Sequence, residues 1–178
     1  MKEIELIRDT IKRFGERKEY PKKARLLNEG DVSEYAFFIE RGCIRSWFND
    51  DGNDITVQFF FDGGFISSFE SLRLCKPSLF NIETIEPSIL HAVHKDALFS
   101  ALNDSPDLKE AVNELIYHRF YHYQRLFLSR IKNSPKRRYE ELIRENPEIF
   151  RRVPHHYIAS YLGITPVSLS RIRNKDRH

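Results

Sequence analysis

One uninterrupted helical stretch, residues 105–133, limits what this chain can fold into more than any other feature. It opens with Ser105 and Pro106, an N-cap residue followed by a proline at the first helical position, and nothing interrupts it before Asn133. Such a helix is about 26 residues and about 39 Å long, at about 1.5 Å per residue. Because one small domain cannot cover that length, other structure must lie along it.

Apolar residues occupy two sides of this helix. The first side has spacings of three and four residues and consists of Val112, Ile116, Phe120, Tyr123, Phe127 and Ile131. The second side consists of Leu108, Leu115 and Leu126. Two apolar sides require two partners, and the simplest pair is the chain's own fold and a second copy of the helix. We therefore expect a homodimer through the helix 105–133.

The residues before the helix alternate between short apolar runs and turns. The turns fall at Gly42, at the DDGN sequence 50–53, which is typical of a β-hairpin, and at the DGG sequence 62–64. The last apolar run is SILHAVH. Short strands spaced in this way predict an antiparallel β-roll between Tyr20 and about Val93. The charged segment 1–20 predicts an amphipathic helix rather than a signal peptide.

The composition excludes several classes of protein. A chain of 178 residues that is 40% hydrophobic can form one ordinary domain and a smaller one. No apolar run is long enough to cross a membrane. Cys43 and Cys75 are too few for a disulfide framework or a four-thiolate cluster, and we expect both to be buried free thiols in a cytoplasmic protein.

Positive charge gathers at the end of the chain. Residues 133–178 hold ten Lys/Arg and five Asp/Glu, a balance of +5, whereas residues 1–132 hold nineteen and twenty-one, a balance of −2, which sums to the net charge of +3. This asymmetry suits a polyanionic partner at one end of the molecule. The candidates for non-specific, salt-dependent attraction to it are Lys136, Arg137, Arg138, Arg151 and Arg152.

The last part of the chain matches the pattern of a helix-turn-helix. In a window that starts at His155, a small residue is needed at position 5, where two helices cross, and a glycine at position 9, where the chain reverses. Ala159 and Gly163 occupy these positions. The apolar positions 4, 8, 10, 15 and 18 hold Ile158, Leu162, Ile164, Leu169 and Ile172. Thr165 then caps the second helix, which Pro166 starts.

The second of these helices has a polar outer face. With the apolar positions turned inward, the outer face carries Val167, Ser168, Ser170, Arg171 and Asn174. A recognition helix contacts base edges in the major groove from its N-terminal half. Arg171 can pair bidentately with guanine, and the serines permit close approach. The other predicted DNA-binding residues, which include candidates for phosphate contacts, are His155, Thr165, Pro166, Arg173 and Lys175.

These parts together resemble the CRP/FNR superfamily of bacterial transcription regulators. The resemblance rests on EGD…FFIERGCIR, the DGN hairpin, FFFDGGFISS, the long helix and the terminal helix-turn-helix, and it runs from about Tyr20 to Lys175. The stretch IFRRVPHHYIASYLGITPVSLSRIRNK is similar to Bacteroidetes-type members.

The resemblance implies an α+β fold in three parts. They are a cyclic-nucleotide-binding-like β-roll at 1–104, a dimerisation helix at 105–133 and a winged helix-turn-helix at 134–178. It further implies a homodimer that reads a two-fold-related operator in double-stranded DNA, with RNA polymerase as a candidate partner. The chain ends a few residues beyond Lys175, so the phosphate contacts of the usual wing hairpin must be missing or come from elsewhere.

The chain departs from members of this family that bind cyclic AMP. In those proteins a helix cap after the sixth strand supplies a glutamate for the ribose and an arginine for the phosphate. Here the two positions fall on Ser68 and Ser78, and the serine that follows the arginine is Leu79. An unpaired phosphate costs on the order of several kcal/mol, so we expect a degenerate pocket without cyclic AMP and no cofactor.

Two possibilities stay open for the roll: it binds an unidentified small-molecule effector, or its role is purely structural. The candidate effector pocket consists of Phe65, Ser67, Ser68, Glu70 and Ser78. The candidates to fill the interior of the roll instead are Phe59, Phe61, Phe65 and Phe69.

The alternative is a stand-alone cupin-like small-molecule-binding protein or enzyme. His91 and His94 leave a strand on opposite faces and cannot bind one metal together. His118 and His122 share a helix face, but no further ligand lies near them in the sequence. No nucleophile elbow, phosphate loop or pair of catalytic carboxylates is present. We therefore expect no metal site and no enzyme.

Overall fold

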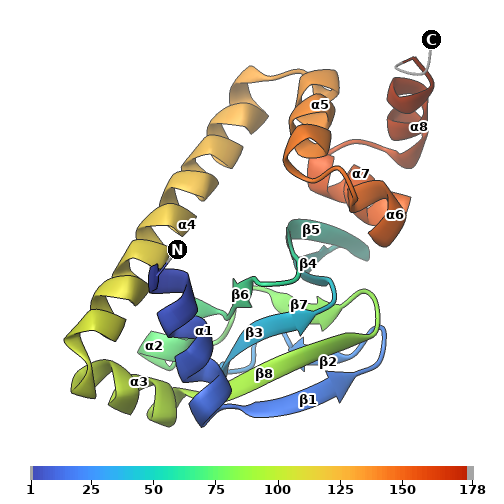
Figure 1. Ribbon diagram of the computed structural model, residues 1–178. Coiled ribbons are helices and arrows are strands. Elements are labelled where there is room, and N and C mark those ends of the chain that lie inside the picture. The colour runs from blue at the N-terminus through green and yellow to red at the C-terminus, as the bar shows by residue number, and fades with distance from the viewer. Residues whose placement is uncertain (1, 176–178) are drawn as a thin grey trace.

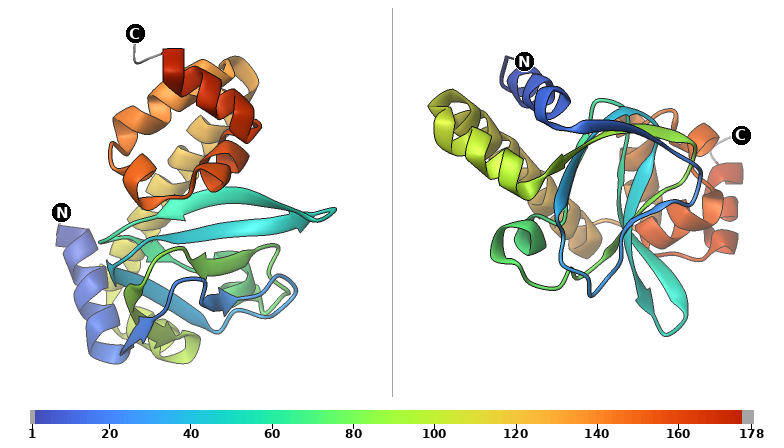
Figure 2. Two further views of the ribbon diagram at one scale, coloured as in Figure 1. Left: turned by 90° about the vertical axis from the view of Figure 1, so that its right-hand side faces the viewer. Right: turned by 90° about the horizontal axis from the view of Figure 1, so that it is seen from below.

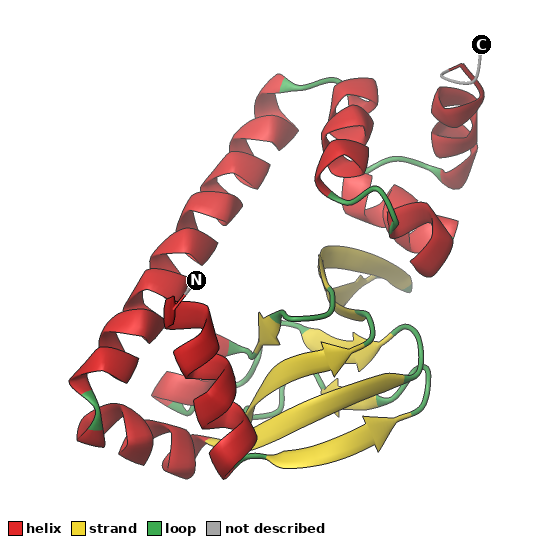
Figure 3. Ribbon diagram, in the orientation of Figure 1, coloured by secondary structure: helices red, strands yellow, loops and turns green. Residues whose placement is uncertain are grey.

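Two four-stranded antiparallel sheets form the N-terminal half of the chain, and helices form the rest (Figure 1; Figure 3). The coordinates are a computed structural model that describes residues 2–175, the last of them by its backbone alone. The strands are β1 (Glu16–Tyr20), β2 (Arg25–Leu27), β3 (Tyr35–Arg41), β4 (Ile44–Asp50), β5 (Asn53–Phe60), β6 (Phe65–Ile66), β7 (Asn81–Thr84) and β8 (Ser88–His94). The helices are α1 (Lys2–Phe14), α2 (Phe69–Leu74), α3 (Lys95–Asp104), α4 (Pro106–Lys132), α5 (Pro135–Glu145), α6 (Ile149–Arg152), α7 (His155–Leu162) and α8 (Pro166–Lys175).

The predicted β-roll is confirmed. Its sheets have the strand orders β1-β8-β3-β6 and β2-β7-β4-β5. The hairpin expected at residues 50–53 joins β4 to β5, with Asp50 opposite Asn53. Side chains that alternate inward along the strands fill the space between the sheets. The buried ones are Phe37, Ile39, Ile44, Phe60, Ile66, Ile82, Leu90 and Ala92.

The prediction of which phenylalanines fill the roll was wrong. Phe59 and Phe61 lie on the other side of their strand from Phe60, because side chains alternate along a strand, and they pack against the C-terminal helices. Phe65 packs outside the roll, 5.3 Å from the ring of Phe38, and Phe69 is exposed.

The N-terminal helix is shorter than predicted. It ends at Phe14, and residues 16–20 form β1, which pairs with β8. The charged sequence ERKEY can form this strand because it lies at the edge of a sheet, with most of its side chains exposed. The buried residues Ile7 and Ile11 of α1 pack with Phe38, Val93 and the start of α4.

The long helix begins and ends close to the predicted residues. The Ser105 side chain accepts a hydrogen bond from the amide of Leu108 at 3.2 Å, as expected of an N-cap. Leu108 and Ala111 are buried against α1. The later part of the helix extends away from α1 and α3 toward α5 and the other C-terminal helices (Figure 1). No helix in the described part of the chain could span a membrane.

The two cysteines have different surroundings. Cys43 is buried, and this burial raises the pKa of its thiol above the usual range. Cys75 is exposed, so the prediction that it is buried was wrong. Its backbone is left-handed, with φ of 53°, where it ends α2.

Candidate nucleic-acid interface

Helices α7 and α8 form the predicted helix-turn-helix. Gly163 has a φ of 65°, the left-handed conformation that reverses the chain after α7. The amide of Ile164 donates to the carbonyl of Ala159 at 3.0 Å. Ala159 and Leu169 are both 1% exposed, which confirms that the two helices cross where the pattern requires a small residue.

The start of α8 is capped as expected. The Thr165 hydroxyl accepts a hydrogen bond from the amide of Ser168 at 3.1 Å. The same hydroxyl lies 3.0 Å from the Ser168 hydroxyl, so these two predicted DNA-binding side chains are tied to each other. Ser168 is half-buried.

The outer face of α8 is uncovered over its first turns. Val167 is 61% exposed, and Ser170, Arg171 and Asn174 are exposed as well. Arg171 makes no hydrogen bond or ion pair within the described residues. A shallow hollow of about 410 Å³ between α5 and α8 brings Lys136 beside Arg171. An anion that approaches this face therefore meets two cationic side chains.

Two predicted phosphate-contacting residues contact each other. A guanidinium nitrogen of Arg173 lies 3.0 Å from Nε2 of His155, and its plane covers the Phe150 ring at 4.7 Å. Burial and the charge of Arg173 lower the pKa of His155, which favours the neutral imidazole that can accept from Arg173. Nothing in the sequence pattern indicated this pair. The side chain of Lys175, a third candidate, lies outside the described residues.

The predicted basic patches are only partly available to a partner. Arg138 donates to the carbonyls of Asn133 and Leu162, both at 2.8 Å, and so closes the ends of α4 and α7. Arg152 is held by acidic residues of the roll. By contrast, Arg137 and Arg151 are exposed, and within the described residues their ion pairs are with glutamates of their own helix or the adjoining turn.

Two of the candidate effector residues, Ser68 and Ser78, contact each other. Ser68 and Ser78 are 3% exposed, and their hydroxyl oxygens lie 2.9 Å apart. Ser78 Oγ also lies 2.8 Å from the carbonyl of Phe80. Ser67 is half-buried nearby on the chain, and Glu70 on α2 is exposed. The structure therefore brings the two serines together, while Phe65 packs against Phe38.

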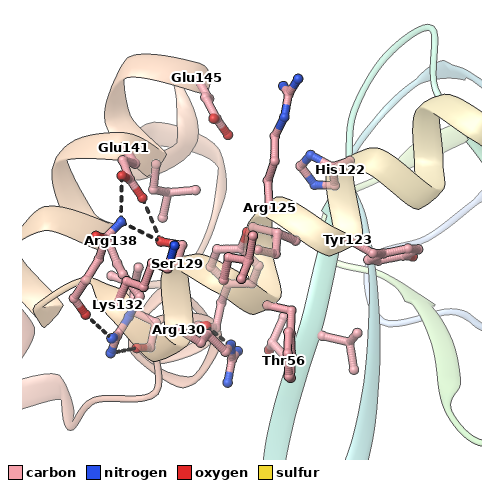
Figure 4. Close-up of a pocket in the computed structure, with 18 of the residues that line it drawn as sticks. Thr56, His122, Tyr123, Arg125, Ser129, Arg130, Lys132, Arg138, Glu141 and Glu145 are labelled. Carbon is pink, nitrogen blue, oxygen red and sulfur yellow. Dashed lines mark hydrogen bonds between the residues drawn. The ribbon is translucent and has the colours of Figure 1, made fainter.

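A cavity of about 690 Å³ is lined by the end of α4, by β5 and by α5 (Figure 4). Figure 4 shows Glu141 of α5 turned toward Ser129 of α4, whose hydroxyl donates to it at 2.7 Å. The opposite wall includes Thr56 of β5, while His122 and Tyr123 line the α4 side. The sequence pattern did not predict this cavity, because its walls come from segments far apart in the chain.

The histidines form no metal site in the described residues. No three His, Cys, Asp or Glu side chains gather there as metal ligands would. His91 instead lies 2.7 Å from Glu40, which also accepts from Arg17. These hydrogen bonds from Arg17 and His91 lower the pKa of Glu40 to about 2.

We compared the chain with known protein families and solved structures. The sequence matches the cyclic nucleotide-binding domain family over residues 17–105, half of the chain. No curated protein matches it.

Three solved structures are similar over nearly the whole chain. The c-di-GMP-responsive global regulator CLP of Xanthomonas campestris has a TM-score of 0.74 at 13% identity, over 97% of this chain and 91% of that one. FixK2 of Bradyrhizobium japonicum has a TM-score of 0.75 at 18% identity, over 90% and 83%. A CRP/FNR-family transcriptional regulator of Eubacterium rectale has a TM-score of 0.72 at 19% identity, over 97% and 82%. The chain therefore belongs to the cyclic nucleotide-binding domain family, and its fold is that of the CRP/FNR transcription regulators.

Proposed function

We propose that this protein is a homodimeric, sequence-specific DNA-binding regulator of transcription. The observation that carries the proposal is the uncovered face of α8, where Val167, Ser170 and Arg171 are exposed on a correctly packed helix-turn-helix. A recognition helix enters the major groove with its N-terminal residues toward the bases. In that position Arg171 can donate both of its outer nitrogens to guanine.

We assign the proposed phosphate contacts from the exposure of the basic side chains. Arg137 and Arg151 are exposed, and Lys136 borders the face of α8. These three side chains are the best placed to attract the DNA backbone in a salt-dependent way. Arg173 and His155 contact each other, so either can reach a phosphate only with the nitrogens that this pair leaves free.

The homodimer is supported by the surface of α4. Phe120, Phe127 and Ile131 are 60%, 65% and 66% exposed, and other apolar residues beside them are also exposed: Tyr117, Tyr121, Tyr123 and Leu128. A monomer rarely leaves so many neighbouring apolar side chains in water. A second α4 packed around a two-fold axis would bury them and would bring two recognition helices to one operator.

We assign one proposed role to each of three segments of the chain. We infer a sensor or platform domain at 1–104, a dimerisation helix at 105–133 and a DNA-binding domain at 134–178. We also infer a cytoplasmic protein without enzymatic activity, since two of the similar solved structures, from Xanthomonas campestris and Eubacterium rectale, are described as regulators. RNA polymerase is a candidate partner of such a regulator at its promoter.

The roll is proposed not to bind cyclic AMP in the usual way. Ser78 stands where a phosphate-binding arginine is expected, and its hydroxyl is already engaged by Ser68 and Phe80. Phe37 and Phe60 fill the interior. Isothermal titration with cyclic AMP should give no saturable heat, and a saturable signal would contradict this part of the proposal.

Selection from a random double-stranded DNA library tests the function directly. The purified protein should enrich a palindrome whose half-sites are about 10 base pairs, or a multiple of this, apart. In gel shifts on that site, a dimer with 6–10 phosphate contacts should lose about 10³-fold to 10⁵-fold in affinity between about 50 and 200 mM salt. Failure to enrich any sequence would contradict sequence-specific binding.

A further inference from the structure

The C-terminal helices are packed on the roll of their own chain. Figure 2 shows them directly above β4 and β5. One buried cluster spans the contact, with Cys43, Phe59 and Ile85 from the roll and Ile158 and Leu169 from the helix-turn-helix. The position of α8 relative to the roll is therefore set by packed surfaces as well as by the connection from α4 to α5.

Arg152 of α6 binds the roll through ion pairs and a hydrogen bond. Its guanidinium lies 2.5 Å from both Asp62 and Glu86, and it donates to the carbonyl of Gly42 at 2.9 Å. These three partners come from three different connections of the roll. Burial opposes the charged guanidinium, but the hydrogen bonds to Glu86 and Asp62 outweigh it and raise the pKa of Arg152 above its usual range.

Arg45 of β4 makes a second contact, with Tyr157 of α7. It is 1% exposed and pairs with Glu83 and Asp54, each at 2.7 Å, so carboxylates of the roll compensate its charge at the contact with α7. Its guanidinium plane lies 3.7 Å from the centre of the Tyr157 ring on α7. A buried, compensated arginine against an aromatic face is a stronger contact than the same pair in water.

Hydrogen bonds between one side chain of α7 and the backbone of β5 add to the contact. The Ser160 hydroxyl of α7 accepts from the amide of Thr56 at 2.9 Å and donates to the carbonyl of Asp54 at 2.8 Å. One hydroxyl of α7 thus binds both a backbone amide and a backbone carbonyl of β5. Rotation of the helix-turn-helix on the roll would break all of these interactions together.

We propose that Arg152 and Arg45, with Tyr157, are positioning residues that set the distance and angle between the two recognition helices of the dimer, and therefore the half-site spacing that the operator must have. This inference rests on the proposed function. One extra base pair moves a half-site by about 3.4 Å and turns it by about 35° around the DNA axis. A docked domain cannot follow this movement, whereas a released domain can.

Gel shifts on operators with altered spacing test the inference. Each half-site is kept, and one or two base pairs are inserted or removed between them. The wild-type protein should prefer the native spacing by a factor of about 5 to 150, the usual size of a coupling between sites. Arg152→Ala should lose most of this preference and keep its preference for the half-site sequence.

Arg151→Ala is the matched control. It removes the same charge from the neighbouring residue, whose ion pair among the described residues is with Glu148 and not with the roll. This control should keep the wild-type preference for spacing, although its overall affinity can fall. Equal spacing preference in Arg152→Ala and the wild type would overturn the inference.

A measurement without DNA separates this inference from the proposed function. Spin labels at Glu19→Cys on β1 and Arg144→Cys on α5, in a Cys75→Ser background, report the distance between the roll and the C-terminal helices. We expect one narrow distribution for the wild type and Arg151→Ala, and a broad one for Arg152→Ala. An unchanged distribution in Arg152→Ala would refute the positioning role, whether or not any DNA binds.

A second variant covers the case in which Arg152→Ala does not fold. Asp62→Asn combined with Glu86→Gln removes the charges from the roll side and keeps the shape of both side chains. It should broaden the distance distribution and flatten the spacing preference in the same way. If this variant behaves as the wild type does, Arg152 does not hold the domain through these carboxylates, and the inference fails.

Discussion

The turn of the helix-turn-helix offers a prediction whose size follows from the coordinates. Gly163 has a φ of 65°, which disfavours any residue with a Cβ by about 1–2 kcal/mol. A Cβ at this position would meet only a guanidinium nitrogen of Arg130, at an ordinary contact distance of 3.8 Å. The stability of Gly163→Ala should therefore fall only by this backbone cost, without a steric clash. Each kcal/mol of lost stability lowers the melting temperature by about 2–4 °C in a chain of this size.

Gly42 provides the comparison. It also has a positive φ, of 131°, but a Cβ there would lie 2.2 Å from the Ser88 hydroxyl and 2.9 Å from the Ser88 Cα. Gly42→Ala should therefore lower the melting temperature clearly more than Gly163→Ala does. Thermal unfolding followed by circular dichroism measures both variants. Equal losses, or no loss in Gly163→Ala, would refute the described geometry of the turn.

Three further predictions concern the core, the dimer and the pH dependence of stability. Leu169→Ala should destabilise the protein by about 2–5 kcal/mol in urea unfolding, because this side chain is 1% exposed; a loss below about 1 kcal/mol would place it at the surface. Phe127→Glu, on the exposed side of α4, should convert dimer to monomer in sedimentation experiments, and an unchanged mass would argue against that interface. Glu40 has a pKa lowered from 4.5 to about 2, so its ion pairs stabilise the fold above pH 4.5 and are lost as the pH falls toward 2. Glu40→Gln should flatten that part of the stability curve, and a curve of unchanged steepness would contradict the described pairs.

Local signals in the sequence predicted much of the fold. The helix starts at Ser105 and Thr165 depend on side chains next to the backbone amides that they cap, and the reversal at Gly163 depends on one residue. The roll followed from turns and short strands in the same way. Such features are visible in a sequence because the residues that cause them are close together in it.

Features that depend on distant partners were missed or predicted wrongly. Arg152 looked like a DNA-contacting residue because its partner Glu86 is 66 positions away. Phe59 and Phe61 looked like candidates to fill the roll because both faces of β5 are covered, so apolar residues occur on each. Strand β1 was hidden because an edge strand can be almost entirely charged.

Base discrimination by Arg171 tests the central claim most directly. Once an operator is selected, affinities are measured for all four bases at each position, with the wild type, Arg171→Ala and Arg137→Ala. We predict that Arg171→Ala loses about 1–3 kcal/mol of binding free energy together with the preference for guanine at one position. Arg137→Ala should weaken binding equally for all sequences and reduce the slope of log affinity against log salt concentration by about one. If Arg171→Ala keeps the full base preference at every position, the exposed face of α8 is not the surface that reads DNA.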